Sequence, residues 1–259
     1  MRDKSPFVFV TLLLLLSGAH AAETTPQLSH PELSGIWMND DTLDETLKRL
    51  GKKRLAPGET LGTTSATGVT SDILTEEYLT IYEQRRAAKS RLAEGAAPCE
   101  LPGLPVLLTY PYPFEILPTP GRLTMIFEAD SQVRRIFLDR DEHLPYDELD
   151  PSYNGDSIGH WDADTLVIDT TGFHDHTELW GGLPHSEALH IVERISFEDE
   201  DTIHNEVTIY DPLALKDPIS RSITYSKRPD WRIREYSCLE NNRDQPDAEG
   251  NRAGGLINN

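Results

Sequence analysis

Apolar and polar positions alternate with a period of two through most of the chain after residue 113. This period is typical of strands with one buried face. A short strand is also expected at residues 34–37. Because eight or nine consecutive strands leave exposed edges unless the sheet closes, we expect a mainly β, antiparallel barrel or strongly curled sheet. The pattern predicts strands near residues 113–117, 121–128, 132–138, 155–162, 164–171, 187–197, 202–210, 219–226 and 231–238.

Before these strands the apolar spacing is helical in two places. Residues 41–50 carry leucines three or four positions apart, and a helix over about residues 76–93 is predicted by the cap Thr75 and the stop Gly95. We therefore expect an N-terminal segment, residues 22–98, with one or two helices, followed by a barrel-like domain over residues 99–240. The Asn-, Asp- and Gly-rich residues 241–259 predict a disordered tail.

The first 21 residues have the pattern of a signal peptide. Arg2 and Lys4 precede the apolar residues 7–16, and Ala19 and Ala21 have the spacing of a signal peptidase site. The apolar run is shorter than the roughly 20 residues that span a bilayer. We expect cleavage near Ala21, a periplasmic or secreted product, and no membrane insertion after cleavage.

Charge and cysteine content narrow the function classes. The chain has 24 Lys and Arg against 44 Asp and Glu, a formal net charge of -20. Nucleic-acid binding needs clustered positive charge, so we expect no nucleic-acid partner. In an oxidising compartment the two cysteines, Cys99 and Cys238, are expected to form a disulfide; two buried thiols are the alternative.

Several segments together resemble one known family. They are PYPFE at residues 111–115, VRRIF at 133–137, SIGHWDADTLVIDT at 157–170, PHSEAL at 184–189, and Cys238-x-Glu240-Asn241. This combination resembles a family of secreted bacterial proteins of unknown function over roughly residues 99–242. The resemblance implies a secreted protein but assigns no activity and no functional residue. Separately, the tripeptide at residues 35–37 is similar to the opening of lipocalin-like barrels.

The hairpin over residues 155–171 can be given a register. A turn at residues 163–164 pairs Asp162 with Thr165 and His160 with Val167. The face with Leu166 is then the core face. His160 and Asp169 lie on the other face as diagonal neighbours, within side-chain reach. That face is either solvated or lines a pocket, where the acid would fix the imidazole tautomer and raise its pKa.

Glu193 is the only charge among the apolar odd-numbered positions of residues 189–197. A turn at residues 198–200 would place it opposite Asn205. A carboxyl group among aliphatic side chains has a raised pKa, as acid–base catalysis requires, or it finds a cation. The second alternative predicts a buried ion pair with Arg134 or Arg135.

One histidine cluster has metal-like spacing. His174 and His176 form an H-x-H pair, and His185 follows nearby as a third ligand for zinc. The alternative is an exposed loop, because the segment is rich in glycine and acidic residues.

Two functions fit these features. The first is a barrel that encloses a small, partly apolar molecule. The alternative is an acid–base pocket enzyme of isomerase, hydratase or lyase type that uses Glu193, His160, Asp169 and His185. The enzyme requires His160 and Glu193 to face one cavity. No motif implies a particular cofactor.

Overall fold

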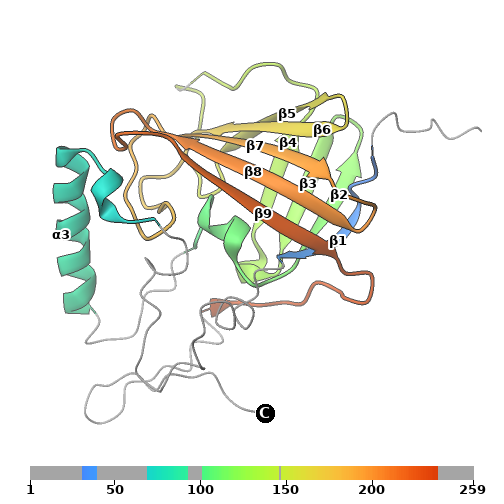
Figure 1. Cartoon of the computed structure of the whole chain (residues 1–259), viewed down its shortest axis with the longest axis horizontal. Coiled ribbons are helices and arrows are strands. Elements are labelled where there is room, and N and C mark those ends of the chain that lie inside the picture. The colour runs from blue at the N-terminus through green and yellow to red at the C-terminus, as the bar shows by residue number, and fades with distance from the viewer. Residues whose placement is uncertain (1–30, 40–68, 93–100, 146, 239–259) are drawn as a thin grey trace, which may run out of the picture.

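The computed structural model describes residues 31–39, 69–92, 101–145 and 147–238. It is mainly β, and nine strands form one closed barrel in sequential order, which confirms the predicted fold class (Figure 1). Among these residues α3 (Glu76–Leu92) is the only α-helix. The strands are β1 (Gly35–Asn39), β2 (Phe114–Thr119), β3 (Arg122–Phe127), β4 (Val133–Phe137), β5 (Asp156–Asp162), β6 (Thr165–Thr171), β7 (His190–Phe197), β8 (Thr202–Tyr210) and β9 (Ile219–Lys227).

The β5–β6 hairpin has the register expected from its sequence. Asp162 pairs with Thr165, and His160 pairs with Val167. Leu166 is 1 % exposed and its face points into the barrel, whereas His160 is exposed on the outside. The alternation of side chains along each strand therefore decides which of these residues can share a site.

Residues 231–238 do not form the predicted strand. A strand there needs a free edge of β9, but β1 pairs with β9 on one side and with β2 on the other, which closes the barrel. The segment instead folds back onto Glu128, whose Oε2 accepts hydrogen bonds from Trp231 Nε1 at 3.2 Å and from the Arg234 amide at 3.0 Å. The barrel thus includes β1, which precedes the domain boundary expected at residue 99.

One pair of neighbouring strands is parallel rather than antiparallel. Ile136 of β4 pairs with Ser157 of β5 in parallel. A parallel pair needs a connection long enough to return to the starting end of the sheet, and residues 138–155 provide it. Residues of this crossover connection contact the outer face of β5 and β6.

The register of β7 and β8 differs from the expected one by two residues. Glu193 pairs with Val207 rather than Asn205, and Phe197 pairs with Ile203. The turn is shifted by one residue toward the C-terminus, since the Glu198 amide donates to the Thr202 carbonyl at 3.0 Å and residues 199–201 lie between them. A shift of two residues keeps every side chain on its face, so Glu193 still points inward.

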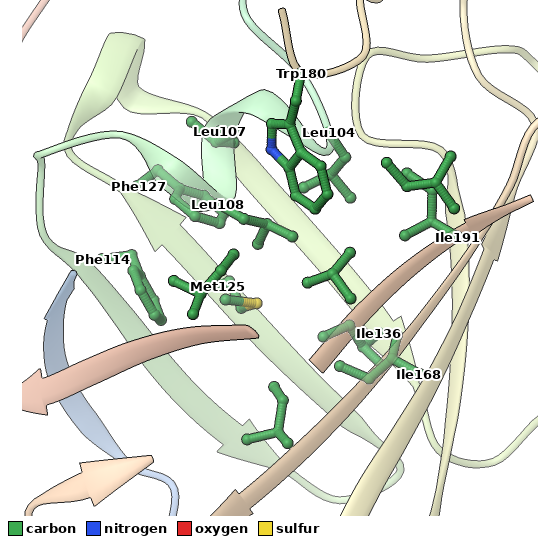
Figure 2. Packing of buried hydrophobic residues seen from close by; sticks show 14 of the residues in the cluster. Leu104, Leu107, Leu108, Phe114, Met125, Phe127, Ile136, Ile168, Trp180 and Ile191 are labelled. Carbon is green, nitrogen blue, oxygen red and sulfur yellow. The ribbon is translucent and has the colours of Figure 1, made fainter. Parts of the chain in front are cut away.

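The barrel interior holds a large cluster of packed apolar side chains. Figure 2 shows these side chains converging from the strands and from residues 104–108. Trp180 donates from Nε1 to the Pro105 carbonyl at 3.1 Å, and the Tyr225 hydroxyl donates to the Leu108 carbonyl at 2.8 Å. These bonds hold η2 (Val106–Thr109) against the barrel, and its side chains Leu107 and Leu108 are buried in the apolar cluster.

Four expectations fall outside the described residues: the signal peptide at 1–21, the helix at 41–50, the tail at 241–259, and Cys99. The disulfide between Cys99 and Cys238 therefore stays a prediction. Within the described ranges, no helix combines the length and apolarity needed to span a bilayer.

Candidate functional site

Helix α3 is fixed beside the loop between β8 and β9 (Figure 1). The Thr75 amide donates to the Ala214 carbonyl and the Thr75 hydroxyl to the Leu213 carbonyl, both at 2.9 Å. Leu74 also forms a bridge with Leu215. These contacts fix the start of α3 against the loop between β8 and β9.

One face of α3 borders a pocket of about 670 Å³. Tyr78, Ile81 and Arg85 line it, and their spacing of three and four residues places them on the same side of a helix. Residues 151, 173–175, 185–187 and 213 form the opposite walls. We call this space the α3 pocket.

The walls of the α3 pocket combine apolar and polar groups. Ile81, Phe173 and Leu213 contribute apolar surface, and Arg85 contributes a cation. Leu213 is 54 % exposed, so its apolar side chain is accessible to a molecule in the pocket. The lining therefore suits a molecule that is partly apolar and partly polar.

Buried Asp211 holds the loop that carries Ser186. Its carboxylate accepts the Ser186 amide and the Ser186 hydroxyl, both at 2.6 Å, and also the Ala214 amide at 3.0 Å. Burial raises the pKa of Tyr78, and the Asp211 carboxylate adds to the rise. Tyr78 thus presents a protonated hydroxyl in the α3 pocket.

His185, one of the expected catalytic residues, lies in the α3 pocket but is 5 % exposed. Its Nδ1 is 2.7 Å from the Ser186 carbonyl, and its Nε2 is 3.1 Å from the His174 carbonyl. A neutral imidazole carries one N–H, which can donate to one of these carbonyls at a time. Both nitrogens are directed at backbone carbonyls of the protein, and the buried ring is not presented to a ligand.

His185 is also not the third metal ligand that the sequence predicts. Its Nε2 is directed to the backbone of His174, so it supports that residue rather than a shared ion. The histidine cluster that the structure does form consists of His174, Asp175 and His176, at the rim of the α3 pocket. The Asp175 carboxylate, rather than His185, is the third potential ligand of this cluster.

The other expected catalytic residues do not share a cavity. Glu193 is fully buried in the barrel interior, with Oε1 2.6 Å from Arg134 Nη2 and Oε2 2.8 Å from Asn205 Nδ2. Its alternative role in an ion pair with Arg134 is therefore confirmed, whereas Arg135 is exposed. His160 is on the outer surface. The quartet expected for acid–base catalysis is not assembled, because Glu193 is at an inward-facing strand position whereas His160 and Asp169 are at outward-facing ones.

Asp169 belongs to a different cluster on the outside of the barrel. Its Oδ1 is 2.7 Å from His143 Nε2, and its Oδ2 is 2.7 Å from His190 Nε2. Asp156 then accepts from His143 Nδ1 at 3.0 Å and from Arg140 at 2.7 Å. We call these five residues the outer-face cluster.

The outer-face cluster fixes the crossover connection through charge. A hydrogen bond with Asp169 raises the pKa of His143 most strongly, and Asp156 adds to the effect against the opposing cost of burial. Burial alone would raise the pKa of Asp169, but hydrogen bonds with His143 and His190 outweigh it and lower that pKa. His143 was not found from the sequence because its loop has no periodicity. The contact of Asp169 with His190 follows from the strand pairing: Asp169 pairs with Val192, and His190 lies two residues before Val192 on β7.

Comparison with family models finds no match for the chain, and comparison with curated proteins finds none either.

Proposed function

We propose that this protein binds a small, partly apolar molecule in the α3 pocket, at one end of the barrel. The observation that carries the proposal is the hollow of about 670 Å³, whose lining combines the apolar side chains of Ile81 and Leu213 with a few polar groups. Ligand pockets have volumes of about 300–1,000 Å³ and a mainly apolar lining with a few polar groups. Arg85 and Tyr78 supply polar contacts for one end of the molecule.

Binding is favoured over acid–base catalysis by His185 and Glu193, because both of these side chains are buried. Both nitrogens of His185 face backbone carbonyls of the protein rather than the open part of the pocket. A general base must lie within hydrogen-bond reach of the substrate. Glu193 does not meet this requirement, since its carboxylate is buried in the barrel interior and bonded to Arg134 and Asn205.

We further propose that binding takes place outside the cytoplasm. The support is the signal-peptide pattern of residues 1–21 and the resemblance to a family of secreted bacterial proteins. A binding protein exported in this way would meet its ligand in the periplasm or in the surrounding medium.

The test uses 8-anilinonaphthalene-1-sulfonate, a fluorescent probe with an apolar aromatic body and one anionic group. We expect saturable binding of one probe per chain. Leu213→Glu should weaken binding about tenfold, because it removes part of the roughly 1.5–3 kcal/mol that a buried leucine contributes and places a like charge beside the sulfonate. Fluorescence titration measures the affinity.

The matched control is Leu117→Glu, on β2 and outside the α3 pocket. Leu117 is also a partly exposed leucine, so the control makes the same chemical change elsewhere. It should leave probe affinity unchanged. Equal affinities for the two variants, with equal unfolding midpoints, would show that the probe does not occupy the α3 pocket and would refute the proposal.

A further inference from the structure

We infer that His174, Asp175 and His176 bind one divalent transition-metal ion of the zinc class. Asp175 Oδ1 is 3.2 Å from His174 Nδ1 and 3.8 Å from His176 Nε2. All three candidate ligand atoms lie within 4.8 Å of one another. The inference concerns the metal ion alone and does not depend on what the α3 pocket binds.

These separations fit the coordination geometry of zinc. Zinc binds imidazole nitrogen and carboxylate oxygen at about 2.0–2.2 Å in a tetrahedron, which places neighbouring ligand atoms about 3.3–3.5 Å apart. The two carboxylate–imidazole distances lie on either side of that range. The exposed side chain of His176 can close the remaining gap by a change of rotamer.

His174 Nδ1 is directed toward the part of the loop where the ion would lie. Its neighbours are the His176 amide, which donates to it at 3.2 Å, and Asp175 Oδ1, also at 3.2 Å. A metal ion bound at Nδ1 would take the place of the amide hydrogen bond. A cation between this nitrogen and the Asp175 carboxylate would be attracted by both.

Neighbouring groups hold His174 in place. Its ring stacks on Tyr153, with ring centroids 5.2 Å apart and an angle of 14° between the planes. Its carbonyl is 3.1 Å from His185 Nε2. A metal ligand that is already ordered loses less entropy on binding, and such supporting contacts are usual around metal ligands.

Nitrogen ligands select the class of ion. Two imidazoles and one carboxylate suit zinc, nickel or copper, whereas magnesium and calcium prefer oxygen ligands only. Three protein ligands leave a fourth position open. His174 and Asp175 also line the α3 pocket, so that position lies at its rim.

The test is isothermal titration of the full chain with Zn²⁺ alone, after removal of metals by a chelator. We expect one equivalent of Zn²⁺ to bind and Mg²⁺ not to compete. His174→Ala combined with His176→Ala should abolish this binding. Asp175→Asn should weaken it at least about tenfold, since even supporting residues of metal sites contribute 10- to 100-fold.

The matched control is His160→Ala, which removes an exposed histidine from β5 far from this loop in the sequence. It should retain the full affinity. Co²⁺ provides a second readout, because intense visible absorption bands report four-coordinate geometry. Absence of Zn²⁺ binding, or equal binding by the double variant, would overturn the inference whether or not the fluorescent probe binds.

Discussion

Glu193→Gln is expected to lower the free energy of unfolding by about 3–5 kcal/mol, the usual cost of breaking a buried ion pair from one side. Both side chains of the Arg134–Glu193 pair are fully buried. Arg134 keeps neutral partners in Ser157 and Thr170, at 3.1 and 2.9 Å, but no other described carboxylate is paired with it. Glutamine therefore leaves a buried cation without its counter-charge. Chemical denaturation followed by circular dichroism measures the loss.

Two further variants make this result specific. Glu206→Gln, an exposed position on the neighbouring strand β8, should change stability by less than about 0.5 kcal/mol. Combining Arg134→Met with Glu193→Leu should recover much of the loss, because a well-packed apolar pair can replace a buried ion pair. Unchanged stability of Glu193→Gln would contradict the structural role.

His143→Gln is expected to lower stability by about 2 kcal/mol near pH 5.5. Its imidazolium bridges two carboxylates, and hydrogen bonds to charged groups contribute about 1.5–3 kcal/mol each, less when partly exposed. The loss should be largest at mildly acidic pH. Denaturation curves of the variant and the unchanged chain, recorded between pH 3 and pH 9, measure it.

The direction of this pH dependence follows from the raised pKa of His143 and the lowered pKa of Asp169. The pKa of His143 is raised by Asp169, so its contribution is complete below the unfolded value of about 6.5 and is lost as the pH rises through the higher folded value. The pKa of Asp169 is lowered, so its contribution is complete above about 3.9 and is lost as the pH falls through the lower folded value. The outer-face cluster is thus most stabilising between about pH 4 and 6.5.

His160→Gln serves as the control, since His160 is exposed on the same outer face of the β5–β6 hairpin. Its stability should follow that of the unchanged chain at every pH. A stability difference for His143→Gln that is the same at pH 5.5 and pH 9 would show that the bridge is not made by an imidazolium.

The sequence predicts those features that depend on local alternation and a short turn. The register of β5 and β6 follows from a two-residue turn, and Glu193 stands out because one charge interrupts an apolar face. Contacts set by closure of the barrel could not be predicted in this way. Residues 231–238 alternate like a strand, but only the pairing of β1 with β9 shows that no edge is left for them.

The candidate sites were predictable to different degrees for the same reason. The H-x-H spacing of His174 and His176 is visible in the sequence, whereas the part played by Asp175 depends on the shape of its loop. His143 reaches Asp169 only because the crossover connection lies against the outer face of the barrel. The α3 pocket forms where a helix and several loops far apart in the sequence come together, and no local sequence pattern predicts that arrangement.

The position of β1 has a consequence for biosynthesis. β1 is made first, but it completes the barrel only when β9, the last strand, has been made. Until then β1 and the most recently made strand each present an unpaired edge, which can join the edge of another chain. During synthesis, the early strands of one chain must therefore be kept from pairing with strands of other chains until β9 is available. Completion of the barrel, rather than growth of the sheet, becomes the step at which aggregation competes with folding.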